Sequence, residues 1–310
     1  MAADEEGPIL ATVRPGNLKE ELAKRSGNFV LSFGFPGSGK TTLHSFLMRY
    51  LMEGGPYKTE VVRRDHGEGA DYETNRMITE WSREWRHGRF PESTPVGENE
   101  IRELSFEVQP MKGVRTPLEF SILEMSGEMM RTVIPSREQK PNLSRVIRDL
   151  AANERLNLVI LLLVNPRVHE NDNLFTSFMS YLDANLGGKD IRKRAKLGIV
   201  ISDPEMALDY LKTYKPEFAH HAEFRGDLVE EFVASFAPQT YRIYKEWPDP
   251  RGAMMMRFHV GAIEDREGMP RLVTPDYGSA SRLFDWLYLQ FTGRRPGPTR
   301  WQRMWSWIRT

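Results

Sequence analysis

The sequence predicts an α/β protein with three layers, in which a mostly parallel β-sheet with one antiparallel edge strand lies between helices. Three observations favour this fold. Short apolar runs alternate with helical stretches, a glycine-rich loop joins one such run to a helix, and two alternating segments follow each other as a hairpin. A chain of 310 residues fits one large domain with insertions.

The composition is that of a folded protein, with 40% hydrophobic, 11% aromatic and 28% charged residues. Forty-three Lys and Arg balance 43 Asp and Glu, so we expect no nucleic-acid partner. The absence of cysteine excludes disulfides, thiolate metal sites and a cysteine nucleophile. An acidic N-terminus without signal-peptide regions, and a longest apolar run of only 158–164, predict a cytoplasmic protein.

The glycine-rich loop lies between an expected strand at 29–33 and an expected helix at 41–52, and a short helix at 17–26 precedes it. It reads Gly34, Phe35, Pro36, Gly37, Ser38, Gly39, Lys40, Thr41, and Thr42 follows as a further candidate for nucleotide binding. The glycines permit a close backbone approach to phosphates. Lys40 supplies a cation for the β and γ phosphates, and Thr41 a hydroxyl for Mg²⁺. A strand before the loop and a helix after it are the context of a true P-loop.

The remaining elements complete the sheet and divide the chain. Residues 72–86 read as a helix and 87–95 as a loop. Alternating segments at 104–108 and 118–122 predict an antiparallel hairpin whose strand at 103–109 forms the edge. Further strands are expected at 156–164, 197–201 and 257–262, and a last helix at 280–291. We therefore expect an extension at 1–27, a P-loop domain at 28–291 with an insertion at about 203–256, and a tail at 292–310.

A second acidic residue is needed at the end of a neighbouring strand, to hold Mg²⁺ through its water and sense the γ phosphate. Glu124 is the best candidate, because it ends the apolar run 120–123. Gly127 follows three residues later and offers a backbone N–H to the γ phosphate. Glu128 is then placed to orient the attacking water.

This ordered set of features resembles the Ras-like GTPases. Their phosphate loop, switch-one threonine, antiparallel strand pair and Asp-x-x-Gly are matched by 34–41, Thr94, 103–123 and Glu124 to Gly127. Residues 88–94 and 126–128 resemble the bacterial double-GTPase proteins of signalling and conflict systems. The resemblance implies that Thr94, with Ser93 as the alternative, binds Mg²⁺ in the triphosphate state and releases it after hydrolysis.

Three positions depart from the family pattern. Glu124 stands where an aspartate is usual, and Glu128 where a glutamine is usual, which favours slow turnover. The base-recognition motif falls at Ser202-Asp203-Pro204-Glu205, which lacks its lysine. Glu205, or Asp203 after a small shift of register, remains available to accept hydrogen bonds from guanine.

The tail is a separate feature. Trp301, Met304, Trp305 and Ile308 share one face if the tail is helical, and the tail contains five arginines and no acid. Such a segment lies at a membrane interface, docks into a partner or folds back on the domain.

The sequence thus favours a GTPase that cycles between GTP and GDP with Mg²⁺, with 55–100 and 125–140 as moving switches. Its partners are expected at these switches, the insertion or the tail. Two alternatives stay open: a GTP-binding scaffold with little hydrolysis, and a P-loop ATPase or small-molecule kinase.

Overall fold

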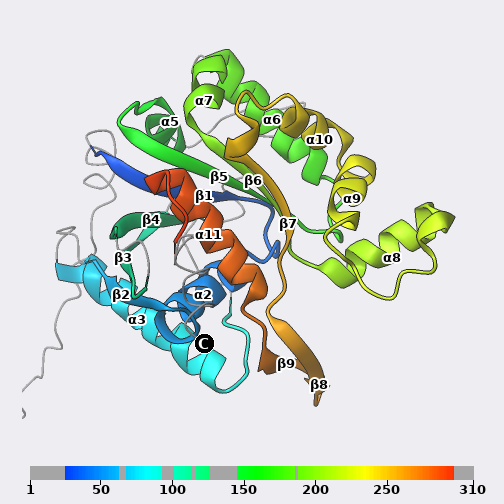
Figure 1. Ribbon diagram of the computed structural model, residues 1–310, viewed down its shortest axis with the longest axis horizontal. Helices are drawn as coiled ribbons and strands as arrows, with labels where there is room; N and C mark the ends of the chain where they lie inside the picture. Colours follow the sequence, from blue (N-terminus) through cyan, green and yellow to red (C-terminus); the bar gives the residue numbers. More distant parts are fainter. Residues whose placement is uncertain are drawn as a thin grey trace, which may run out of the picture.

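The computed structural model describes residues 25–62, 68–92, 101–112, 116–125, 145–185 and 188–296, around a seven-stranded sheet (Figure 1). Its strands lie in the order β2-β3-β4-β1-β5-β6-β7. They are β1 (Gly27–Phe33), β2 (Tyr57–Val61), β3 (Ile101–Pro110), β4 (Leu118–Met125), β5 (Leu156–Val164), β6 (Lys196–Ile201) and β7 (Ala253–Arg257). The five strands β4-β1-β5-β6-β7 are parallel to one another, whereas β3 is antiparallel to both β2 and β4. The predicted fold class is confirmed.

Strand β5 shows why the sheet lies between two layers of helices. Its side chains alternate between the two faces, as the pleat of a strand requires. Ile160 and Leu162 belong to one buried cluster, and Leu161 and Leu163 belong to the other. Because both faces are covered, the strand reads as a continuous apolar run rather than as an alternating one.

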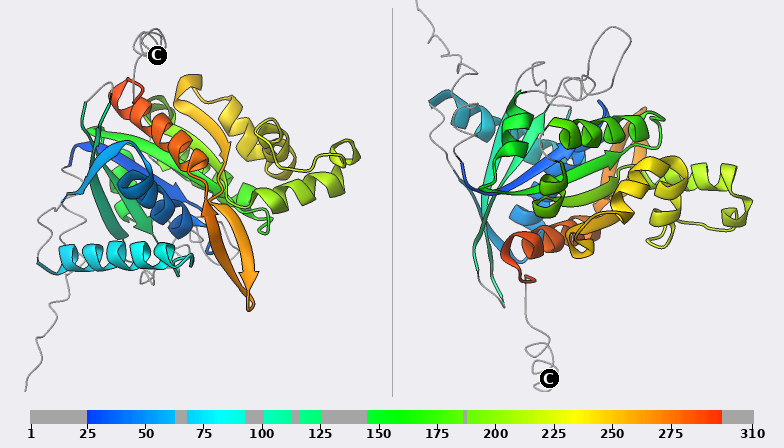
Figure 2. Two further views of the ribbon diagram at one scale, coloured as in Figure 1. Left: turned by 60° about the horizontal axis from the view of Figure 1, so that its bottom comes forward. Right: turned by 90° about the horizontal axis from the view of Figure 1, so that it is seen from above.

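The helices divide between these two clusters (Figures 1 and 2). The first face carries α2 (Lys40–Arg49), α3 (Glu68–Arg86) and α11 (Gly278–Thr292). The second carries α5 (Arg145–Ala152), α6 (Asn171–Asn185), α7 (Gly188–Arg194), α9 (Leu228–Phe236) and α10 (Pro238–Lys245). A π-helical turn, η1 (Tyr50–Gly54), continues α2, and α8 (Pro204–Tyr214) follows β6.

The predicted hairpin of β3 and β4 is confirmed, and it pairs Leu104 with Ile122 and Phe106 with Phe120. One strand was not predicted: β2 pairs with β3 on its outer side, so that β3 is second from the edge. The strand expected at 257–262 was placed too late, because β7 begins at Ala253 and ends at Arg257. Its methionines join the sheet, and Met256 is fully buried.

A second sheet also went unpredicted. It consists of β8 (Gly261–Arg266) and β9 (Met269–Pro275), which form a hairpin between β7 and α11. The hairpin projects from the body of the domain (Figure 2). Midway along β9, the N–H of Leu272 donates to the carbonyl of Gly88 over 2.7 Å. The hairpin is therefore attached to the turn that follows α3.

The chain between β6 and β7 is a long helical crossover. It contains α8, α9 and α10 and two 3-10 turns, η2 (Pro216–Phe218) and η3 (Pro250–Gly252). Phe232 of α9 is fully buried in the second cluster, and α8, which runs outward from the sheet (Figure 1), buries Leu211 in the same cluster. No helix within the described ranges has the length and apolarity of a bilayer span. Residues 1–24 and 297–310, with most of the predicted first helix and of the tail, lie outside the description.

Candidate functional site

The glycine-rich loop connects β1 to α2 at the carboxyl edge of the parallel strands. Gly37 and Gly39 have φ angles of +72° and +86°, which L side chains rarely adopt. The N–H of Ser38 donates to the carbonyl of Phe35 over 3.1 Å, and the N–H of Leu43 donates to that of Gly39 over 2.9 Å. The loop thus turns tightly into the first turn of α2, and the positive end of a helix dipole favours an anion.

Two glycines of the loop are also required by the close approach of neighbouring groups. A Cβ on Gly34 would lie 2.6 Å from Ser38 Oγ and 3.0 Å from the carbonyl oxygen of Leu163. A Cβ on Gly39 would lie 3.2 Å from the Cβ of Ser202. The loop is therefore packed against the ends of both β5 and β6.

Lys40 places a cation inside the loop. Its ammonium group donates to the carbonyls of Gly34 and Phe35 over 2.8 and 3.0 Å, and the residue is 7% exposed. The positive end of the α2 dipole and the Lys40 charge act at the same place. Thr41 and Thr42 follow on the first turn of α2 and are half-buried. The arrangement suits a ligand that carries several negative oxygens.

Asn165, directly after β5, supports the loop from outside. Its side-chain N–H donates to the carbonyl of Gly37 over 3.0 Å, and its Oδ1 accepts from the N–H of Arg167 over 2.9 Å. Asn171 in turn donates to the carbonyl of Asn165 over 2.7 Å. Asn165 was not predicted from the sequence. The available signal was a polar residue directly after the apolar run 158–164.

The residues expected to recognise the base follow β6 on the same edge. The N–H of Ser202 donates to the carbonyl of Val164 over 3.1 Å, which holds this residue against Gly39. Asp203 caps α8 by accepting from the N–H of Met206 over 3.1 Å. Glu205 is exposed on the first turn of α8.

Arg167 engages the other oxygen of Asp203. Its Nε and Nη2 both donate to Asp203 Oδ2, each over 3.1 Å. The side chain of Arg167 is 65% exposed and that of Asp203 is 28% exposed. Both oxygens of this carboxylate are thus engaged within the protein, so Glu205 is the more available of the two expected base-reading acids.

The predicted metal-side acid belongs to the neighbouring strand. β4 is parallel to β1, with Leu123 opposite Leu31, so the backbone of Glu124 lies near the start of the loop. The side chain of Glu124 lies outside the described part of the chain, and so do Thr94 with Ser93, Gly127 and Glu128. The structure brings together residues 34–42, Ser202, Asp203 and Glu205 on one edge.

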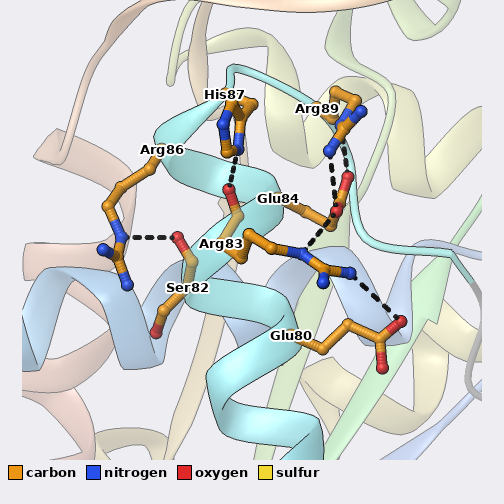
Figure 3. Close-up of polar contacts among 7 residues, drawn as sticks. All are labelled: Glu80, Ser82, Arg83, Glu84, Arg86, His87 and Arg89. Atoms are coloured by element: carbon orange, nitrogen blue, oxygen red, sulfur yellow. Dashed lines mark hydrogen bonds and ion pairs between the residues drawn. The ribbon is translucent and has the colours of Figure 1, made fainter.

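The segment that leads toward Thr94 is fixed by ion pairs after α3 (Figure 3). Arg89 Nη2 donates to Glu84 Oε1 over 3.0 Å, and Arg83 Nε donates to the same oxygen over 3.3 Å. Loss of hydration alone would raise the pKa of Glu84, but the two guanidinium groups outweigh it and lower that pKa. The Glu84 carboxylate is therefore ionised at neutral pH and anchors the turn.

A second set of polar contacts lies at the same edge of the sheet, after the end of β7. His259 Nε2 lies 2.7 Å from Asp276 Oδ2, and Ser279 Oγ lies 2.8 Å from His259 Nδ1. The N–H of Gly278 donates to Asp276 Oδ1 over 2.8 Å, and this bond, followed by the contact with His259, lowers the pKa of Asp276. Ser279 is buried in the first turn of α11. The contacts among His259, Asp276 and Ser279 therefore connect the end of β7 to α11, and Ser279 is not an exposed nucleophile.

A cavity of about 590 Å³ lies at the opposite edge of the sheet. It is lined by the amino ends of β1 and β4 and by the end of α11, including Asn28, Glu119, Phe291 and Arg294. The loop of residues 34–41 lies at the carboxyl ends of the same strands. This cavity is therefore separate from the candidate phosphate site.

The strand order and the loop define an α/β fold of the P-loop NTPase type. Among solved structures, the chain is similar to the signal recognition particle receptor SRb-GTP/SRX complex from Chaetomium thermophilum. The TM-score is 0.31 at 14% identity, covering 79% of this chain and 94% of that one. No family model and no curated protein matches the chain. A likeness of this strength assigns no function, and the proposal below is argued from the site.

Proposed function

We propose that this protein is a guanine-nucleotide-binding switch that binds GTP with Mg²⁺ and hydrolyses it slowly. The observation that carries the proposal is the loop of residues 34–41, with buried Lys40 at its centre and supports from Asn165 and Ser202. Left-handed glycines, the amino-terminal end of α2 and one cation together favour the binding of phosphate oxygens.

Lys40 is already placed for this role. Its ammonium donates to two carbonyls of its own loop, so triphosphate oxygens would exchange for neutral acceptors and gain a charge-assisted bond. The buried stem of Lys40 limits the freedom lost on binding. Replacement of Lys40 should therefore remove most of the affinity for any triphosphate.

The donors near the loop suit Mg²⁺. Thr41 supplies a hydroxyl at the start of α2, and Glu124 is a carboxylate residue of the adjacent strand β4. Hard oxygen donors of this kind are what Mg²⁺ prefers. When bound, the ion would neutralise charge between the β and γ phosphates. Thr94 remains the proposed third ligand.

The hydrolytic part of the proposal rests on the resemblance to the Ras-like GTPases. Gly127 would offer its N–H to the γ phosphate, and Glu128 would orient water. A carboxylate beside phosphate charge is unfavourable, which supports slow turnover. If Glu128 does not orient water, the same residues would form a scaffold that binds GTP with little hydrolysis.

A P-loop ATPase or kinase is the second candidate. The observation that favours it is the engagement of Asp203 by Arg167 and Met206, which leaves Glu205 alone to read guanine. Partners at the switches, at the crossover with α8 or at the tail, and membrane contact through the tail, remain proposals with either nucleotide. A cytoplasmic location also remains a proposal.

The test is equilibrium binding of fluorescent GTP and ATP analogues to the full chain with Mg²⁺, followed by phosphate release. We expect GTP to be preferred and released phosphate to accumulate slowly. Lys40→Ala should weaken binding by at least about 100-fold, which corresponds to roughly 3 kcal/mol. Lys58→Ala, which removes an exposed lysine from β2, is the matched control and should bind normally.

Each result points to one alternative. Preference for ATP replaces the switch with the ATPase or kinase. GTP binding without phosphate release identifies the scaffold. Undiminished binding by Lys40→Ala would show that the loop is not the phosphate site.

A further inference from the structure

The ion pair of Arg167 and Asp203 joins two loops at the carboxyl edge of the sheet. Arg167 lies three residues after the end of β5, and Asp203 lies two residues after the end of β6. Because Nε and Nη2 both donate to one carboxylate oxygen, one edge of the guanidinium plane is fixed by Asp203. The exposed fraction of the arginine side chain is 65%, so much of that group is open to a ligand.

Both partners are tied to the phosphate loop through their neighbours. Asn165 accepts from the N–H of Arg167 and donates to the carbonyl of Gly37. Ser202, directly before Asp203, packs against Gly39. Arg167 is thus two residues, and Asp203 one residue, from a side chain that contacts the phosphate loop. The ion pair therefore lies beside the loop, on the side of β5 and β6.

We propose that Arg167, held in place by Asp203, covers the nucleobase by stacking its guanidinium plane on the ring. This inference rests on the proposed nucleotide binding at residues 34–41 and assigns its base subsite. Arginine stacks on aromatic rings because its charge is delocalised over a planar, weakly hydrated group. The base-recognition motif of the Ras-like GTPases has a lysine at the position of Asp203. In this chain Asp203 instead anchors Arg167, a cation from another loop.

Stacking also explains how the roles divide at this edge. A π-face is common to all purines, so Arg167 contributes affinity with little discrimination between guanine and adenine. Discrimination requires hydrogen bonds to the edge of the base, for which Glu205 is exposed on α8. Asp203 holds the arginine and caps the helix. The three charged residues therefore have distinct and separable functions.

The experiment compares Arg167→Ala with the unmodified chain, using GTP, ATP and ribose 5-triphosphate, which lacks a base, as competitors of a fluorescent GTP analogue. We expect Arg167→Ala to weaken the binding of GTP and of ATP by a similar factor of about 5 to 50, which is the range measured for base stacking. Ribose 5-triphosphate should bind both proteins equally. Arg266→Ala, which removes an arginine of 64% exposure paired with Glu264 on β8, is the control and should leave all three affinities unchanged.

Two further variants sharpen the result. Arg167→Lys keeps the charge and loses the planar group, so the affinity for GTP and ATP should still fall. Asp203→Asn can still cap α8 but holds the arginine less well, and a smaller loss of the same kind is expected.

An unchanged affinity of Arg167→Ala for GTP and ATP overturns the inference. So does an equal loss for ribose 5-triphosphate, which would make Arg167 a phosphate or folding contact. If the unmodified chain binds none of the three ligands, the proposed function itself fails. These outcomes are distinguishable because Lys40→Ala must abolish binding of all three.

Discussion

The phosphate loop and the outer edge of the same site are held by different forces. The loop depends on backbone hydrogen bonds and on glycines, of which Gly34 has no room for a side chain and Gly37 and Gly39 have positive φ angles. The outer edge, formed by Arg167, Asp203, His259 and Asp276, depends on contacts between partly exposed polar side chains. Backbone geometry is set by steric exclusion, whereas exposed ion pairs are individually weak. The first region should therefore tolerate substitution poorly and the second well.

The largest effect is expected at Gly34. Gly34→Ala forces a methyl group to within 3.0 Å of the Leu163 carbonyl, which belongs to a central strand and has little freedom to move. We expect the free energy of unfolding to fall by about 2 to 3 kcal/mol. Chemical denaturation of the variant and the unmodified chain measures the change.

Gly37→Ala is the matched comparison within the loop. A Cβ there meets nothing within 4 Å, so only its φ of +72° opposes an alanine. That strain costs roughly 1 kcal/mol. Equal losses for the two variants would show that contact with β5 does not define the loop.

A smaller effect is expected at Asn165. Asn165→Ala removes the donor to the Gly37 carbonyl and the acceptor for the N–H of Arg167, at a cost of about 1 to 2 kcal/mol. Asn165→Asp restores the acceptor but not the donor, and adds a negative charge beside the loop. It should bind triphosphate more weakly than Asn165→Ala does.

The control for Asn165 is Asn157, at the other end of the same strand. Its side chain donates to Asn28 Oδ1 over 3.0 Å at an exposed position. Asn157→Ala should cost less than about 0.5 kcal/mol and leave nucleotide affinity unchanged. If its effect matches that of Asn165→Ala, the special role of the loop contact is refuted.

The sequence was sufficient where local pattern and structure agree. The loop was predictable because its glycines, lysine and threonine occur together in a short segment, and β5 because the apolar run 158–164 suits a strand buried on both faces. In β2, Lys58 and Glu60 are exposed and the apolar positions are few, so the alternation was weak. The hairpin of β8 and β9 carries mostly exposed residues and gives no apolar signal.

The outer edge was predictable only in part. The position of Ser202, Asp203 and Glu205 after β6 follows from strand order, and Ser202 packs against Gly39 of the loop. Arg167 and Asp203 are 36 residues apart and belong to different loops. Their ion pair depends on how these loops pack together, and a local sequence pattern does not predict it. Asn165 was missed for the same reason. The roles of Thr94, Glu124, Gly127 and Glu128 stay predictions.

The smallest effect is expected at Asp276. Its lowered pKa means that the folded state binds the proton less readily than the unfolded chain, so the carboxylate stabilises the protein above the unfolded pKa near 4. This contribution is lost as the pH falls through the folded pKa. The side chain is 54% exposed, so we expect Asp276→Asn to cost less than about 1 kcal/mol at pH 6 to 7. Denaturation at pH 7, 5 and 3 should show this difference shrinking toward zero at the lowest pH. A difference that persists or grows in acid would mean that Asp276 acts through the shape of the turn before α11, and the outer edge would then resemble the loop.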